Sequence, residues 1–341
     1  MRRTYLDHNA SAPLSEAASN AMRGWLDVGH VGNPSSIYAE GRRARRAVED
    51  AREHVAQAIG ARPKDIVFTS GATEANVTVL RAASGPIVCS AIEHPSVLET
   101  AELLGARVVG VDSGGRVDPS ALEGLLEPGA LCSIVWANNE IGTIQDVTDI
   151  AGVCRKVGAL LHLDGAQALG KIPVDVTSID CDFLTLSSHK IGGPIGAGAL
   201  WIRPGLAVDP LMTGGHQERG RRAGTEPVLS LIGFGAAATE VDARLEAAGH
   251  VTGLRDRLAD RLVAAGGRIN GCMATALPNT LNIRFDDVAG DALLMALDMA
   301  GVAASSGSAC TAGSLEPSHV LLALGLTHDE ASQALRFSLG P

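Results

Sequence analysis

Two side chains in this sequence lie in surroundings that suit covalent chemistry. Lys190 follows an apolar segment and the polar run Ser-Ser-His, and glycines come soon after it. A lysine in such surroundings can lose its proton and form a Schiff base with a carbonyl compound, although a surface lysine is the ordinary alternative. Cys310 lies among serine, glycine, alanine and threonine residues, where a thiol is not expected to pack in a core. We predict a nucleophile carried on a loop.

Two other motifs follow strand-like segments and have the chemistry to bind a charged ligand. The small residues 70–73 precede an apolar-periodic helix, whose first N–H groups favour an anion such as phosphate. An ordinary turn capped by Thr73 remains the alternative. Asp164 ends another strand, on the side of a parallel sheet where ligands bind. Its carboxylate could keep a cofactor's ring nitrogen protonated, or it could cap a helix.

The elements that must position these residues alternate along the chain. Seven apolar segments read as strands, namely 66–69, 87–90, 107–111, 131–136, 160–163, 183–187 and 198–202. Helical periodicity is found before and between them, at 15–26, 39–60, 95–104, 118–126 and 147–157. This alternation predicts an α/β fold with a mainly parallel seven-stranded sheet covered by helices.

The pattern changes after about residue 245. A charged helix (251–265), a strand (280–285) and a helix (291–300) precede the Ser/Gly loop of Cys310 and a last helix. We therefore predict a large domain over 15–245. A small α+β domain is predicted over 1–14 and 246–341, carrying the Cys310 loop.

Composition restricts the class of protein. The 28 Lys and Arg residues against 38 Asp and Glu residues give a net charge of −10, which disfavours nucleic acid and anionic membranes as partners. Neither a signal-peptide pattern nor an apolar run of about 18 residues is present, so a cytoplasmic protein without a membrane span is expected. The six cysteines lack the spacing of a zinc site, and no metal is expected. Cys89, Cys132 and Cys181 are predicted to be buried.

Long, ordered motifs along nearly the whole chain resemble the cysteine desulfurases, specifically the NifS/IscS-type branch of the class V pyridoxal-phosphate (PLP) aminotransferases. They are YLDHNASAP, GNPSSIYAEGRRAR, FTSGATEAN, IEHPSVLET, ANNEIGTIQ, HLDGAQALGKIPVDV, SSHKIGGPIGAGAL, GGHQERGRRAGTEP, SSGSACTAGSLEPSHVL and LRFSLG. The resemblance implies the PLP-dependent transferase fold, also called aminotransferase fold type I.

The resemblance also implies roles around the cofactor ring. Lys190 would hold PLP through a Schiff base and later act as general base. Asp164 would pair with the ring nitrogen, and Gln167 would bond the ring hydroxyl. His94 would stack on the ring and relay protons.

Other roles implied by the resemblance concern the phosphate, the substrate and a second subunit. The phosphate ligands would be Ala72, Thr73, Ser187 and His189. Thr225 would reach the cofactor phosphate of the neighbouring subunit, which implies a homodimer. Asn139 and Arg336 would lie at the substrate, with Asn139 also against the cofactor and Arg336 as the clamp for the substrate carboxylate.

The activity implied is removal of sulfur from L-cysteine, which leaves L-alanine and a persulfide on Cys310. The persulfide would pass to an acceptor protein, such as an iron–sulfur scaffold. A selenocysteine lyase or an aminotransferase of the same family is the alternative enzyme, but neither needs a thiol at position 310. A sulfur-relay subunit without turnover is the alternative outside enzymes.

The sequence departs from the family pattern at two places. After the lysine the family usually has Tyr-Gly-Pro-Lys-Gly, whereas this chain has Gly192-Gly193-Pro194-Ile195-Gly196. An aromatic and a cation expected beside the cofactor are therefore replaced. Family members also continue for several tens of residues beyond the segment that ends this chain at Pro341. Docking of a scaffold through such a tail is accordingly not expected.

Overall fold

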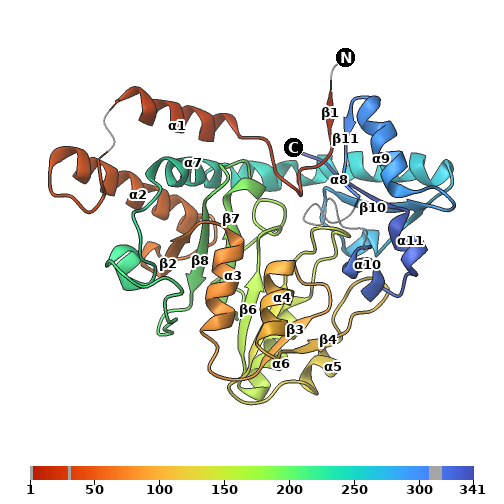
Figure 1. The fold of residues 1–341 in the computed structure, drawn as a ribbon, viewed down its shortest axis with the longest axis horizontal. Helices are drawn as coiled ribbons and strands as arrows, with labels where there is room; N and C mark the ends of the chain where they lie inside the picture. Colours follow the sequence, from red (N-terminus) through yellow and green to blue (C-terminus); the bar gives the residue numbers. More distant parts are fainter. Residues whose placement is uncertain (1–2, 30–31, 307–316) are drawn as a thin grey trace.

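A computed structural model describes residues 3–29, 32–306 and 317–341, and a seven-stranded sheet forms its centre (Figure 1). The strands, in the spatial order β2-β8-β7-β6-β5-β3-β4, are β2 (Ile66–Thr69), β8 (Gly198–Ile202), β7 (Phe183–Ser187), β6 (Leu160–Asp164), β5 (Leu131–Val135), β3 (Ile87–Ser90) and β4 (Arg107–Val109). Only β8 runs antiparallel to its neighbours. The predicted α/β fold and the mainly parallel sheet are confirmed.

Helices cover both faces of this sheet. They are α1 (Glu16–Asp27), α2 (Ala39–Gln57), α3 (Ala72–Arg81), α4 (Pro95–Leu103), α5 (Pro119–Glu123), α6 (Val147–Val157) and α7 (Val228–Ala238). Adjacent strand residues point to opposite faces, so Phe68 packs with α2 and α7 while Val67 packs with α3 and α4. Burial on both faces explains why these strands are continuous apolar runs.

A second group of elements packs beside the sheet. Its strands form an antiparallel sheet of order β12-β10-β9 and a parallel pair of β1 with β11. The strands are β9 (Gly267–Ile269), β10 (Thr280–Phe285), β12 (Ala334–Ser338), β1 (Thr4–Tyr5) and β11 (Val302–Ala303), and the helices are α8 (Val241–Ala264), α9 (Gly290–Met299), α10 (His319–Ala323) and α11 (His328–Ser332). The domain boundary predicted at residue 245 falls inside α8.

Two helix predictions differ from the structure. The helix expected over 251–265 begins at Val241, because residues 241–248 are mostly good helix formers and the isolated Gly249 costs only about 1 kcal/mol. Helix α7 was not predicted, because it is apolar on almost every side and so lacks an amphipathic period. Its position between α1, α2 and the sheet accounts for that composition.

Within the described residues, no helix combines the length and apolar character needed to cross a membrane. The same residues contain no cluster of three or more His, Cys, Asp or Glu side chains placed to hold a metal ion. Cys89, Cys132 and Cys181 are buried as predicted, and Cys154 is buried with them.

Candidate active site

A cavity of about 370 Å³ opens where the parallel strands end. Strands β2, β5, β6 and β7 each place residues in it at or shortly after their last position, as expected for a sheet of this type. Ten of the predicted site residues line it, namely Ala72, Thr73, His94, Asn139, Asp164, Gln167, Ser187, His189, Lys190 and Arg336. Thr225 is exposed and does not line this cavity, and Cys310 lies outside the described residues.

Lys190 occupies a short 3₁₀ turn, Ser188–Lys190, directly after β7. Its Nζ donates hydrogen bonds to the main-chain oxygens of Asn9 (2.7 Å) and Ala10 (2.9 Å). Two neutral main-chain carbonyl groups therefore hold the amine. This geometry keeps the nitrogen at the cavity wall, where a carbonyl compound could reach it.

Asp164 ends β6 and is only 3% exposed. Its Oδ2 accepts a hydrogen bond from Asn76 Nδ2 (2.8 Å), and its Oδ1 accepts one from the Ala166 N–H (2.9 Å). These two bonds fix the orientation of the carboxylate. A buried carboxylate held in this way can stabilise a cationic group that enters the cavity.

The turn between β2 and α3 presents backbone donors to the same cavity. Gly71 precedes the first turn of α3 and, having no side chain, cannot cap that turn with a side-chain hydrogen bond. Gly198 on β8 allows the close approach, because a Cβ atom there would lie 2.6 Å from the Gly71 carbonyl carbon. The start of α3 therefore provides N–H groups and a positive helix end, which suit a phosphate.

Two histidines at the cavity favour the neutral form. His94 precedes α4, and its Nδ1 accepts a hydrogen bond from the Ser96 N–H (3.1 Å), which places the proton of the neutral ring on Nε2. Burial lowers the pKa of His94, against the opposing effect of Asp164. Burial, reinforced by Lys190 and Lys171, lowers the pKa of His189 to about 4.

Arg336 is 1% exposed and its guanidinium meets the cavity from β12. Its Nη2 forms an ion pair with Asp7 Oδ1 (2.6 Å), and its Nη1 donates to the Asn139 main-chain oxygen (3.1 Å). Arg336, predicted from the sequence to bind the substrate carboxylate, thus already contacts an acidic side chain, Asp7. Asp7 was not singled out from the sequence.

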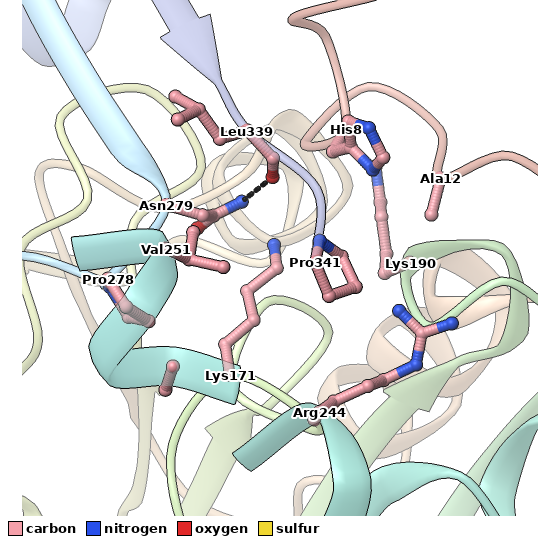
Figure 2. A pocket seen from close by; sticks show the side chains of 12 residues that line it. His8, Ala12, Lys171, Lys190, Arg244, Val251, Pro278, Asn279, Leu339 and Pro341 are labelled. Carbon is pink, nitrogen blue, oxygen red and sulfur yellow. Dashed lines mark hydrogen bonds between the residues drawn. The ribbon is translucent and has the colours of Figure 1, made fainter. Parts of the chain in front are cut away.

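Gly192, which departs from the family pattern, packs against Arg244, a residue that lines a second, smaller cavity together with Lys190 (Figure 2). Its φ of +81° is left-handed, and a Cβ atom there would lie 2.6 Å from Arg244 Nη2. Arg244, Lys171, His8 and Lys190 line the cavity of about 40 Å³ shown in Figure 2. The absence of a side chain at position 192 thus leaves room for the Arg244 guanidinium.

Asn9 is the main site residue that sequence reasoning missed. It is 1% exposed, and its side-chain Nδ2 donates to the Asn139 oxygen (3.0 Å) and to Thr280 Oγ1 (2.8 Å). Its main-chain oxygen accepts from both Lys190 (2.7 Å) and Gln167 (2.9 Å). The only signal for it was its place inside the quoted motif YLDHNASAP.

Comparisons with known proteins agree with this geometry. The family model described as Aminotransferase class-V matches residues 4–341. The chain is 43% identical to a cysteine desulfurase of Gluconacetobacter diazotrophicus over 99% of its own length and 88% of the relative. A solved NifS-like protein superposes with a TM-score of 0.92 at 35% identity, covering 99% of this chain and 94% of that one. The solved structure titled "SspA in complex with cysteine" has a TM-score of 0.85 at 32% identity and covers 99% of both chains.

Proposed function

Because the chain belongs to the class-V aminotransferase family, and within it to the cysteine desulfurases, we propose that it removes sulfur from L-cysteine, leaving L-alanine and a persulfide on Cys310. The observation that carries this proposal is the convergence of Lys190, Asp164 and His94 on one cavity at the strand ends. The cavity combines a lysine, a fixed carboxylate and the start of a helix, each from a different part of the chain. Together these groups suit one cofactor.

The cavity residues fit pyridoxal 5'-phosphate. Lys190 would bond it covalently, Asp164 would face its ring nitrogen and Gln167 its ring hydroxyl. The phosphate would lie at the start of α3 with Ala72, Thr73, Ser187 and His189. When bound, PLP supplies an electron sink for the negative charge that develops on the substrate Cα.

Three side chains of this protein would control protons in that reaction. Asp164, whose orientation is fixed by Asn76 and by a backbone N–H, would hold a proton on the ring nitrogen. Lys190 would remove the Cα proton of the substrate with its Nζ. His94, with its proton on Nε2, would lie against the ring as a neutral donor.

Arg336 would bind the substrate carboxylate. Its guanidinium already contacts Asp7 and the Asn139 oxygen, so its orientation is set before substrate arrives. A planar, pre-oriented guanidinium suits a carboxylate in two-point contact. Asn139 would lie beside both substrate and cofactor.

Cys310 would attack the substrate sulfur as a thiolate. A new S–S bond forms, the substrate C–S bond breaks, and its electron pair stays with the carbon skeleton, which takes up protons and leaves as alanine. Described residues on both sides of the Cys310 segment support this role. Ser305 forms two backbone hydrogen bonds with Arg336 (2.7 and 3.1 Å), and Ser318 donates to Glu140 Oε2 (2.5 Å).

Both of those partners, Arg336 and Glu140, line the cavity. Cys310 is five positions from Ser305, and an extended chain spans at most about 18 Å over that number of residues. The contacts of Ser305 and Ser318 therefore support the proposal that the Cys310 thiol reaches a substrate in the cavity.

We further propose a homodimer, in which Thr225 serves the cofactor phosphate of the partner subunit. Its exposure, away from the cavity of its own chain, is the observation that supports this arrangement. The persulfide would be passed to a sulfur-acceptor protein in the cytoplasm, an iron–sulfur scaffold being one such acceptor.

Alanine and sulfide release from L-cysteine, measured with added PLP and a thiol reductant, tests the proposed activity. The wild-type protein should release both products, and Lys190→Ala should release neither because it lacks the base and the covalent attachment. Lys64→Ala, at an exposed lysine, is the matched control and should behave as wild type. Alanine release by Lys190→Ala at the wild-type rate would refute the proposal.

A further inference from the structure

Lys171 is a buried base that the reaction described above does not use. It lies in the turn after β6 and lines the smaller cavity together with Arg244, His8 and Lys190 (Figure 2). No Asp or Glu is among the residues that line this cavity. Burial lowers the pKa of Lys171 well below its usual value, and Lys190, Arg336 and Arg244 lower it further.

The hydrogen bonds of Lys171 go to two amide oxygens. Its Nζ donates to Asn9 Oδ1 (2.8 Å) and to Gln167 Oε1. On its other side, the Gln167 amide donates from Nε2 to the Asn9 main-chain oxygen (2.9 Å). Lys171 and Asn9 thus contact opposite ends of the same amide group.

These contacts allow only one orientation of the Gln167 amide. If the amide were turned over, its oxygen would face the Asn9 oxygen and its NH₂ group would face the Lys171 amine. The Asn9 oxygen would then face another acceptor, and the Lys171 amine would lose the oxygen to which it donates, inside the protein, where an unpaired polar group costs about 1–3 kcal/mol. Of the two protons on Nε2, the Asn9 oxygen takes one, and the other can serve a ligand in the main cavity, which Gln167 lines.

We propose that Lys171 is a positioning residue that holds the Gln167 amide with its N–H side toward the ring hydroxyl of the cofactor. This inference rests on the proposed function. A donor at the ring oxygen stabilises the ionised oxygen, which makes the neighbouring nitrogen bonded to Lys190 easier to deprotonate. Without Lys171 the amide can turn its oxygen to the ring, and that nitrogen then holds its proton to higher pH.

The test is a pH titration of the visible absorbance of the PLP-loaded protein without substrate. For Lys171→Met the midpoint should rise by about one pH unit, as expected for loss of one hydrogen bond to a charged group. Gln167→Ala should raise it by a similar amount. The double variant should match Gln167→Ala alone, because Lys171 acts through the amide.

Arg244→Met is the matched control, since Arg244 is a cation of the same cavity and contacts neither Gln167 nor Asn9 in any hydrogen bond of the described residues. The shift of the titration midpoint caused by Arg244→Met should add to the shift caused by Gln167→Ala, and it should become smaller at high salt. The same additive, salt-sensitive behaviour in Lys171→Met, or an unchanged midpoint, would overturn the proposal.

Two further measurements keep the outcome decisive. If Lys171→Met does not fold, Lys171→Gln, which can donate one hydrogen bond to Gln167 Oε1, should show a smaller shift than Gln167→Ala. A shift equal to that of Gln167→Ala would count against the proposal. Failure of the wild-type protein to take up PLP would instead refute the proposed function itself.

Discussion

At the scale of one residue, Glu93 shows how burial reduces the negative charge near the cavity. It precedes His94 and is fully buried, and its Oε1 accepts hydrogen bonds from Ser90 Oγ (2.5 Å) and the Val135 N–H (2.7 Å). Burial raises the pKa of Glu93 to about 8, and the charge of Asp164 adds to this. Glu93 is therefore protonated near neutral pH.

The raised pKa predicts a pH-dependent stability. In the unfolded chain Glu93 ionises near its ordinary pKa, while in the folded protein it keeps its proton until about pH 8. The stabilisation present at low pH is therefore lost as the pH rises between those values, by up to about 1.4 kcal/mol per pH unit. Urea unfolding from pH 5 to pH 8 should show wild type losing stability relative to Glu93→Gln.

Glu102→Gln, at an exposed glutamate of α4, controls for the loss of one negative charge. A difference between wild type and Glu93→Gln that stays constant over this pH range would contradict the assignment of a protonated Glu93.

Residue types in the quoted motifs predicted the cavity well, but not the partners of those residues. Most of the ten cavity residues named from the sequence lie at or shortly after strand ends or at helix starts, and the ends of parallel strands must meet at one edge. Asn9 and Asp7 were missed because their partners, such as Lys190 and Arg336, are distant in the sequence. No local pattern carries that information.

At the scale of elements, the strands were the most predictable part of the fold. Apolar runs between turn residues gave all seven strands of the large sheet within two residues at each end, since each run is buried on both faces. Helices without a polar face were less predictable, as α7 shows. Loops that approach a side chain from elsewhere, such as the one at Gly192, depend on packing that the sequence alone does not reveal.

The packing of the loop after β7 predicts a difference in stability between two glycine variants, Gly192→Ala and Gly205→Ala. Gly192→Ala places a Cβ atom 2.6 Å from Arg244 Nη2 and 3.2 Å from the Pro13 oxygen, at a left-handed φ of +81°. Gly205→Ala has a comparable φ of +95° with no atom within 4 Å, so it measures the backbone cost alone. That backbone cost is about 1–2 kcal/mol.

We expect Gly192→Ala to lower the free energy of unfolding by about 1 kcal/mol more than Gly205→Ala, because Arg244 must also move. Urea denaturation of the two variants measures the difference. Equal losses would mean that the Arg244 contact does not restrict this loop.

At the scale of the whole molecule, the proposed dimer divides each active site between two chains. Lys190 would serve its own subunit and Thr225 the partner, so in a hybrid of the two variants both defects fall on one site and the other site is intact. Lys190→Ala and Thr225→Ala proteins are each expected to be weakly active or inactive alone. When they are unfolded together and refolded as a mixture, half of the dimers should be hybrids with one intact site.

The refolded mixture should therefore regain about a quarter of the wild-type rate of alanine formation. Separately refolded proteins that are combined afterwards, before subunits exchange, are the control. Activity of the mixture no higher than the sum of its parts would contradict a site shared between subunits.

Sulfur transfer through Cys310 is the central claim, and one comparison tests it directly. Sulfide and alanine release from L-cysteine with a reductant are measured for wild type and Cys310→Ala at matched PLP occupancy. The account predicts that Cys310→Ala keeps the visible absorbance of the bound cofactor but releases no sulfide, because the substrate sulfur has no thiolate to accept it. Sulfide release by Cys310→Ala at the wild-type rate would contradict the account and favour a lyase that acts without this thiol.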